Sequence, residues 1–176
     1  MVLEERVGAS NRVGVMRAGG EYRLVATRPV TPGKYLFTIV GELTRTPTRY
    51  TVQSDGMTHV DIPEEYEAEA VLDRFYWRFM NHSCDPTAVI RDRQVFSLKP
   101  IELGQEITFN YNTTEYEMAE PFSCRCGSSR CGGRVRGFRF LRDEERERLR
   151  PWLSDHLLSV LEGDVIEPKD HDVVQR

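Results

Sequence analysis

The sequence predicts a β-rich α+β domain of several short strands and few helices. Before residue 120, most apolar residues lie in short runs that are separated by turn-forming Gly, Pro or Asp. A single segment in that region is predicted to be helical, and further helical segments follow close to the C-terminus. With 176 residues, the chain is long enough for one compact hydrophobic core.

The first elements that we expect are strands. Residues 12–28 carry two apolar runs around Ala18-Gly19-Gly20-Glu21, and a glycine pair between two such runs is typical of a hairpin. Thr31-Pro32-Gly33-Lys34 is a turn signal. It leads into a predicted strand over Tyr35–Val40, which Gly41-Glu42 ends.

A second hairpin is expected within residues 43–62. Tyr50–Gln53 forms an alternating strand, Ser54-Asp55-Gly56 provides the turn, and Thr58–Ile62 returns along the first strand.

The one helix of this region is predicted to begin at Pro63. Proline suits the first turn of a helix, and Glu64 and Glu65 complement the helix dipole. The apolar positions from Tyr66 to Phe79 follow helical spacing only roughly, and we expect their aromatic rings to pack in the core.

A third pair of strands is predicted at Ala88–Ile90 and Gln94–Leu98, joined by a turn at Arg91-Asp92-Arg93. Residues 99–106 then form a loop that leads into an aromatic strand, Ile107–Tyr111.

Two helices are predicted close to the C-terminus. The first is the charged segment Asp143–Arg150, and the second begins at Pro151 and is ended by Gly163. The apolar stripe of the second helix is more often core cover than a partner site. Residues 164–176 have little apolar content, so they are predicted to be a flexible tail.

Composition excludes several classes of protein. No apolar run approaches the roughly 18 residues of a membrane span, and the acidic N-terminal residues do not resemble a secretory signal. We therefore expect an intracellular protein, cytoplasmic or nuclear, without a membrane partner. The formal net charge of −4 argues against a nucleic-acid site driven by phosphate contacts and is compatible with a basic peptide substrate. The sequence contains no signal for the oligomeric state.

The four cysteines predict a metal site. Cys84 stands alone, whereas Cys124, Cys126 and Cys131 lie close together among Ser, Arg and Gly. A disulfide pair is the alternative, but the chain lacks the cysteine density of a disulfide scaffold, and buried free thiols fit this polar context poorly. Four thiolates bind zinc tetrahedrally and leave no open position, so the site would be structural.

Three motifs in a fixed order carry a family resemblance. They are Asn81-His82-Ser83-Cys84, the aromatic strand that ends at Tyr111, and the Cys-x-Cys-x4-Cys run that begins at Cys124. Together the segment from Phe79 to Val135 resembles the SET-domain protein lysine methyltransferases with a cysteine-rich post-SET extension. The resemblance implies several small sheets and a knot-like C-terminal segment. On this basis we expect a SET domain over residues 1–120, a post-SET zinc segment over 121–137, a helical extension over 138–163 and the tail beyond.

The resemblance also implies a function. It implies transfer of a methyl group from S-adenosylmethionine to a lysine side-chain amine of a protein, either a histone or another basic protein. The catalytic residues that it implies are Tyr111, Phe109, which would tune how many methyl groups are added, and Tyr50 as a channel wall. The cofactor contacts that it implies are Gly20, Glu21, Tyr22, Arg78, Asn81, His82 and Phe122, and the zinc ligands are Cys84, Cys124, Cys126 and Cys131.

Two other readings stay open on the sequence alone. The Gly-x-Gly that the family carries before Leu24 is replaced by Glu21-Tyr22-Arg23, so a catalytically weak SET-like module that binds a protein partner is the alternative function. A zinc-stabilised β domain with no relation to methyl transfer would require the three motifs to coincide by chance. Whether the protein binds S-adenosylmethionine separates the first two readings.

Overall fold

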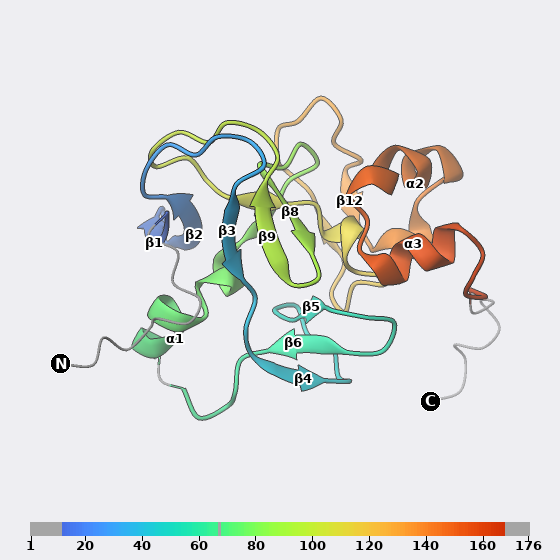
Figure 1. Cartoon of the computed structure of the whole chain (residues 1–176), viewed down its shortest axis with the longest axis horizontal. Helices are drawn as coiled ribbons and strands as arrows, with labels where there is room; N and C mark the ends of the chain where they lie inside the picture. The colour runs from blue at the N-terminus through green and yellow to red at the C-terminus, as the bar shows by residue number, and fades with distance from the viewer. Residues whose placement is uncertain (1–11, 67, 168–176) are drawn as a thin grey trace.

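The computed structural model describes residues 12–66 and 68–167. Its framework consists of small β-sheets, with short helices at both sides of the sheets (Figure 1). The strands are β1 (Val13–Ala18), β2 (Glu21–Ala26), β3 (Tyr35–Thr38), β4 (Glu42–Thr44), β5 (Val52–Gln53), β6 (His59–Asp61), β7 (Asn81–His82), β8 (Ala88–Arg91), β9 (Gln94–Ser97), β10 (Thr108–Phe109), β11 (Phe122–Ser123) and β12 (Arg134–Val135). The α-helices are α1 (Ala68–Arg74), α2 (Asp143–Leu149) and α3 (Asp155–Leu161), and the 3-10 helices are η1 (Tyr76–Phe79), η2 (Tyr111–Thr113), η3 (Phe138–Phe140) and η4 (Arg150–Trp152).

The predicted hairpins are confirmed. β1 and β2 pair antiparallel from Ala18 opposite Glu21, and the two turn residues Gly19 and Gly20 have φ angles of 60° and 86°. Such left-handed angles at both central positions define the turn type that matches the twist of a hairpin, and glycine adopts them without steric cost. β8 and β9 form a second tight hairpin.

Two three-stranded sheets form the centre of the molecule, β3-β9-β8 and β4-β6-β5. The predicted hairpin within residues 43–62 is present as β5-β6, and β4 adds a third strand that the sequence did not indicate. The chain passes from the first sheet to the second through Gly41. A Cβ atom at Gly41 would lie 2.1 Å from the backbone oxygen of Asp61, so only glycine permits this close approach.

The predicted helix from Pro63 to Phe79 was wrong in extent. Residues 63–66 form a turn, α1 begins at Ala68, and a separate 3-10 helix follows at Tyr76–Phe79. The reason is that Phe75, Tyr76 and Trp77 are consecutive and all buried, whereas one α-helix cannot direct three consecutive side chains into one core. The tighter 3-10 turn places Trp77 so that its ring N–H donates to the Val40 carbonyl oxygen at 2.9 Å.

The predicted strand Ile107–Tyr111 was also too long. Only Thr108 and Phe109 form β10, and η2 starts at Tyr111, where the Asn110 side chain accepts from the Asn112 amide. β10 pairs in parallel with β7, with Thr108 opposite Asn81 and Phe109 opposite His82. This pairing sets the Asn81–Cys84 box beside the residues that lead to Tyr111.

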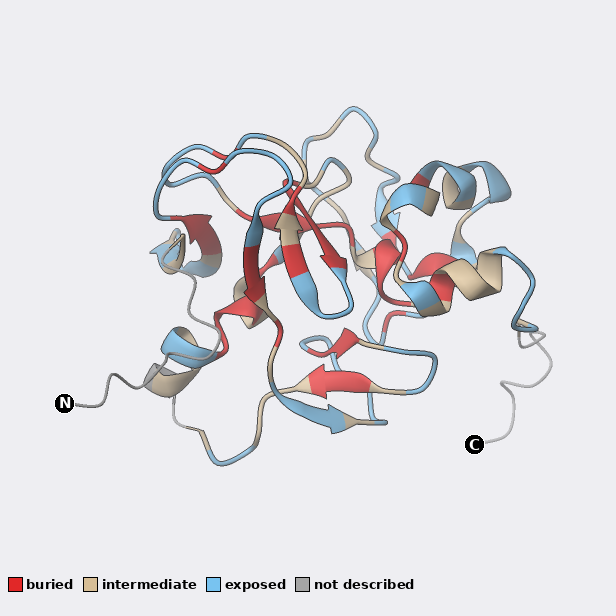
Figure 2. Ribbon diagram, viewed as in Figure 1, coloured by how far each residue is buried: buried red, intermediate tan, exposed pale blue. Residues whose placement is uncertain are grey.

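Two apolar clusters hold the chain together. The larger one joins the central sheets to η1, with Leu24, Phe37 and Trp77 at most 2% exposed, and Figure 2 shows buried residues concentrated there. The smaller cluster packs Phe138 against Leu149, Leu153 and Leu157 of the C-terminal helices. The apolar stripe of the last helix is therefore core cover in the structure.

The charged helix of the C-terminal region is confirmed as α2, whereas the predicted start of the next helix at Pro151 was wrong. Pro151 lies in the 3-10 helix η4, and α3 starts four residues later because the Leu153 backbone is extended. Gly163 follows α3 with a φ angle of 80°, as expected for a helix stop. Residues 168–176 of the predicted tail lie outside the described residues, and Glu167 pairs with Arg146 at 2.9 Å. In the described part of the chain, every helix is too short to cross a bilayer.

Candidate active site

An open groove of about 990 Å³ runs between β2, the Asn81–Cys84 box and the segment that leads into the cysteine cluster. Most of the predicted site residues line it. They are Glu21, Tyr50, Arg78, Asn81, His82, Tyr111, Phe122, Cys124 and Cys126. The structure thus brings together residues that are far apart in the chain and that only the order of the motifs had related to one another.

A narrow channel of about 30 Å³ adjoins the groove. Phe109, Val52, Trp77 and Met80 form apolar parts of its wall. The groove and the channel share five lining residues: Arg49, Tyr50, Arg78, Tyr111 and Met118. Tyr111 therefore lies where the wide space and the narrow one meet.

Tyr111 is held rigidly at this junction. Its hydroxyl donates to the Met80 carbonyl oxygen at 2.8 Å, and its ring lies 4.7 Å from that of Phe109 and 5.9 Å from that of Phe122, measured between centroids. Burial raises the pKa of the phenol above its usual value, and the nearby carboxylates of Glu115 and Glu106 raise it further. The hydroxyl therefore keeps its proton at neutral pH.

The His82 ring is fixed between the backbone and the cysteine cluster. Its Nδ1 accepts from the Tyr111 amide at 3.1 Å, so the ring proton is on Nε2, which lies 3.3 Å from the Cys84 sulfur. Burial lowers the pKa of His82 to about 4, so the ring is neutral at pH 7. The side-chain amide of Asn81 donates to Glu106 Oε1 at 2.7 Å.

Two predicted cofactor residues do not line the groove. Gly20 lies in the β1-β2 turn, and Tyr22 faces the other side of β2 because side chains alternate along a strand. The Tyr22 ring packs 5.2 Å from Phe79 and lines a neighbouring pocket of about 680 Å³.

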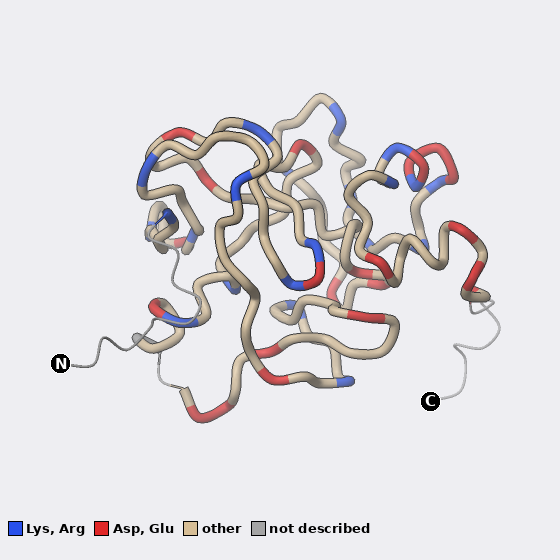
Figure 3. The backbone as a smooth tube through the Cα atoms, in the orientation of Figure 1, with Lys and Arg blue, Asp and Glu red and all other residues tan. Residues whose placement is uncertain are grey.

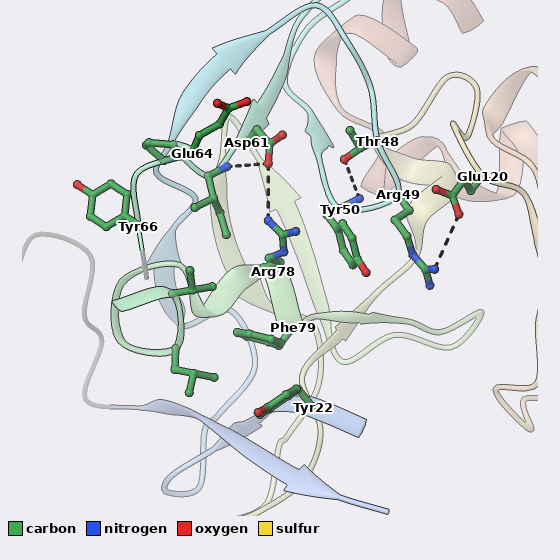
Figure 4. A pocket seen from close by; sticks show the side chains of 14 residues that line it. Tyr22, Thr48, Arg49, Tyr50, Asp61, Glu64, Tyr66, Arg78, Phe79 and Glu120 are labelled. Atoms are coloured by element: carbon green, nitrogen blue, oxygen red, sulfur yellow. Dashed lines mark hydrogen bonds and ion pairs between the residues drawn. The ribbon is translucent and has the colours of Figure 1, made fainter. Parts of the chain in front are cut away.

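This neighbouring pocket shares Arg49, Tyr50, Arg78 and Glu120 with the groove. Figure 4 shows these four side chains on the wall of the pocket. The Arg78 guanidinium lies 4.2 Å from the centroid of the Tyr50 ring and 3.8 Å from Asp61. Tyr50 is 46% exposed, so it forms an outer wall beside the channel rather than part of its interior.

The fold adds charged groups to the groove that were not among the predicted site residues. Arg23 lies on the same face of β2 as Glu21, and strand alternation could have identified it. Its guanidinium is 3.9 Å from Glu106, which lines the groove as well. Arg49 and Glu115 line the channel, and no local pattern in the sequence indicates this position.

The four predicted metal ligands converge. Ligand atoms of Cys84, Cys124, Cys126 and Cys131 all lie within 4.8 Å of one another, and the Cys84 and Cys124 sulfurs are 3.9 Å apart. A tetrahedral zinc with Zn–S bonds of about 2.3 Å separates its sulfurs by about 3.8 Å, so the donor set fits zinc in both chemistry and spacing. The cluster accounts for all four cysteines of the chain and leaves none for a disulfide.

Small sheets that gather an Asn-His-Ser-Cys box, a half-buried tyrosine and a four-cysteine cluster around one groove define a SET-like domain with a post-SET metal site. Residues 21–112 match the family described as the SET domain, and the chain belongs to that family.

Curated relatives and solved structures agree with this family. The chain is 37% identical over 91 residues to "Methyltransferase flvH" of Aspergillus flavus, which covers 48% of this chain and 49% of that protein. It is 31% identical over 131 residues to "Histone-lysine N-methyltransferase, H3 lysine-36 specific" of Gibberella zeae, which covers 66% of this chain and 14% of that protein. The chain thus spans about half of the first relative and a small part of the second.

The fold is similar to a solved structure of KRYPTONITE in complex with mCHG DNA and SAH. The TM-score is 0.53 at 20% identity, over 69% of this chain and 28% of that chain. At this level of identity the similarity concerns the fold alone.

Proposed function

We propose that this chain is an S-adenosylmethionine-dependent protein-lysine N-methyltransferase that acts on a histone or another basic protein. The observation that carries the proposal is the position of Tyr111, at the junction between a wide polar groove and a narrow channel with apolar walls. Methyl transfer to lysine needs two such spaces, one for the donor and one for an extended aliphatic side chain, meeting where the methyl group passes.

The groove suits the parts of S-adenosylmethionine, which supplies the methyl group when it is bound. Phe122 offers an aromatic face for adenine, and Asn81 offers a side-chain amide. Arg23 is a partner for a carboxylate, and Glu21 and Glu106 are partners for an ammonium or hydroxyl groups. The fit therefore includes Arg23 and Glu106 in addition to the residues that the sequence indicated.

The channel suits a lysine that must lose its proton before it reacts. A lysine amine has a usual pKa of about 10.4, and desolvation favours the neutral form. The apolar part of the channel wall comes from Phe109, Trp77 and Val52. The Tyr111 hydroxyl donates its hydrogen bond to the Met80 carbonyl oxygen. The Tyr111 oxygen therefore has a lone pair directed to accept from an incoming amine and so to orient it.

Zinc has a structural part in this proposal. Cys124 and Cys126 line the groove, so a metal on the four thiolates would fix one wall of the donor space. A site with four protein ligands has no open position, so the metal would not contact the substrate.

The substrate class rests on two kinds of support. Several relatives are named H3 lysine-36 specific histone methyltransferases. The pocket beside the channel carries three carboxylates, of which Asp61 lies 3.8 Å from Arg78 and Glu120 lies 3.8 Å from Arg49. Glu64 is therefore the carboxylate that remains to favour a basic peptide (Figure 4). A histone substrate would place the protein in the nucleus, which is part of the proposal.

The test is a methyl-transfer assay with the zinc-loaded protein, labelled S-adenosylmethionine, and core histones and nucleosomes as acceptors, read by mass spectrometry of the acceptor. We expect methylated lysine with the wild type and a loss of about 100-fold or more for Tyr111→Phe, since a positioned hydrogen-bonding group in an active site contributes that much. Tyr35→Phe, at an exposed tyrosine, is the matched control and should leave the rate unchanged.

Calorimetry separates the proposal from its alternative. Binding of S-adenosylmethionine that Asn81→Ala weakens and Tyr111→Phe preserves supports the assignment of the groove. A folded protein that binds neither S-adenosylmethionine nor its demethylated product would contradict the proposal and favour a non-catalytic module that binds a protein partner.

A further inference from the structure

A second cleft, of about 330 Å³, also reaches the cysteine cluster and is lined by other residues than the groove. Cys84 lines this cleft, whereas Cys124 and Cys126 line the groove, and the two spaces share no residue. Its most frequent lining residue is arginine: Arg130, Arg134, Arg136, Arg142 and Arg148. Figure 3 shows basic positions around α2 and on the chain that leads to it.

The local structure directs these arginines outward. Val135 in β12 is 1% exposed, so Arg134 and Arg136, one residue before and after it, face away from the core. On α2, Leu149 is buried in the C-terminal cluster, and the adjacent Arg148 is exposed at the cleft. In each of these two elements, burial of one apolar residue therefore leaves the neighbouring arginines exposed at the cleft.

Most of this positive charge is not neutralised inside the protein. Glu145 is the single acidic residue among those that line the cleft, and it pairs with Arg142 at 3.3 Å. Among the described residues, no carboxylate oxygen lies within 4.0 Å of the guanidinium of Arg130, Arg134, Arg136 or Arg148. The Arg136 guanidinium instead packs 4.6 Å from the centroid of the Phe140 ring, which holds it in place at the cleft.

The negative charge of four zinc-bound thiolates would not account for all five arginines of the cleft. A zinc ion with four thiolates carries a formal charge of about −2, and Cys84 brings this charge to the edge of the cleft. Five guanidinium groups against one carboxylate exceed that amount, so a positive excess remains. It remains although the chain as a whole has a net charge of −4.

We propose that this arginine cleft binds the phosphate backbone of a nucleic acid. Guanidinium groups are planar and always charged, and their paired N–H donors match two phosphate oxygens at once. The arginines come from the cysteine loop, from β12 and from α2, so they form an array that suits successive phosphates better than one isolated anion. This binding goes beyond methyl transfer, because the cleft shares no residue with the groove or the channel.

The test measures binding of a fluorescent DNA duplex of about 30 base pairs to the zinc-loaded protein by anisotropy, over a range of salt concentrations. We expect Arg134→Glu/Arg148→Glu to weaken binding by about 10-fold or more and to reduce the slope of log affinity against log salt by about 2. The matched control is Arg17→Glu/Arg45→Glu, which makes the same change in net charge at two exposed arginines outside the cleft. It should retain most of the affinity.

Each of the other outcomes would overturn or replace the proposal of a nucleic-acid site. Equal losses in the cleft variant and the control would overturn the proposal, because binding would then depend on overall charge. Absence of binding by the wild type at low salt would overturn it as well. Binding of a fluorescent polyglutamate peptide without binding of the duplex would replace the nucleic acid with an acidic protein partner. Because a carboxylate near the thiolates can disturb folding, Arg134→Gln/Arg148→Gln repeats the test without adding negative charge, with zinc content as the check.

Discussion

The two walls of the groove are built by different physical means. On one side, Asn81, His82 and Tyr111 stand on elements that pack against the larger apolar cluster. On the other side, Phe122 and Cys124 belong to a segment, residues 119–134, in which no residue is buried. Hydrophobic packing thus holds one half of the site, and we infer that the cysteine cluster holds the other half.

The energetic consequence of this difference is large. Ordering the backbone costs about 1–2 kcal/mol per residue, and a segment without buried side chains recovers little of this cost from the hydrophobic effect. The two-residue strands β11 and β12 supply only a short ladder. A structural zinc contributes about 10–16 kcal/mol in small domains, which would offset a large part of this cost.

Removal of the metal should produce the largest effect, confined to one wall. We expect chelation or Cys126→Ser to lower the affinity for S-adenosylmethionine by about 100-fold or more, because the ordering of the segment would be lost. Calorimetry measures this affinity, and far-UV circular dichroism should show that the sheets persist. Ser129→Ala in the same loop is the control, and addition of zinc to the chelated protein should restore binding. Loss of all β structure on chelation would show that the two walls are not independent.

A smaller effect is expected from the aromatic residue on the metal-dependent wall. Phe122→Ala should weaken binding of S-adenosylmethionine by about 10-fold through loss of stacking, with zinc content unchanged. Phe140→Ala, at a half-exposed ring outside the groove, is the matched control. If Phe122→Ala leaves the calorimetric affinity unchanged, the segment acts only as a cover and not as part of the binding surface.

Glu115, in the well-packed wall of the channel, should make the stability of the protein depend on pH. Burial raises the pKa of Glu115 from 4.5 to about 7, and its Oε2 lies 3.6 Å from the Nε2 of His59, whose pKa burial lowers. Since the folded state holds the Glu115 proton more tightly, its contribution to stability is complete below about pH 4.5 and is lost as the pH rises to about 7. Relative to Glu115→Gln, the wild type should lose free energy of unfolding over that range, at most about 3 kcal/mol.

Urea unfolding at several pH values measures this difference. His59 contributes in the opposite sense, because a histidine with a lowered pKa loses stability as the pH falls. Its contact with Glu115 makes its contribution part of the measured difference. A difference that is constant with pH would mean that Glu115 is ionised in the folded protein.

The smallest expected effect concerns the number of methyl groups in the product and not the affinity for S-adenosylmethionine. Phe109 is buried in the channel wall and has no hydroxyl to retain a water beside the amine, so the proposed activity should add more than one methyl group. Phe109→Tyr should shift the product towards monomethyl-lysine, with a change in the first transfer of less than about 3-fold, and mass spectrometry of the acceptor distinguishes the products. A wild type that stops at one methyl group would contradict this prediction.

Local patterns predicted the hairpins and the cysteine cluster well. Gly19-Gly20 specified a turn through backbone geometry, and the spacing of the cysteines specified a shared metal through coordination chemistry. Both signals depend on residues close in sequence or on a strict chemical requirement, so they can be recognised in the sequence without knowledge of the fold.

Features set by tertiary contacts could not be predicted in this way. The helix at residues 63–79 breaks because its three adjacent aromatic residues are all buried, and Tyr111 leaves its strand for η2. Arg49 and Glu115 reach the channel together because two distant segments meet there, and the Gln53 amide of β5 donates to Glu115 Oε1 at 2.8 Å. Net charge was equally uninformative about the arginine cleft, because it averages over a surface on which charge is unevenly distributed.

The parallel pairing of β7 with β10 has a consequence for how the protein folds. Asn81 meets Thr108 only after the intervening chain, including the β8-β9 hairpin, has returned beside it. Contacts of high sequence separation form slowly, and parallel pairs cannot be joined by a tight turn. We therefore expect catalytic competence to be gained late in refolding, after most of the sheet structure is present, so that activity and circular dichroism recover at different rates.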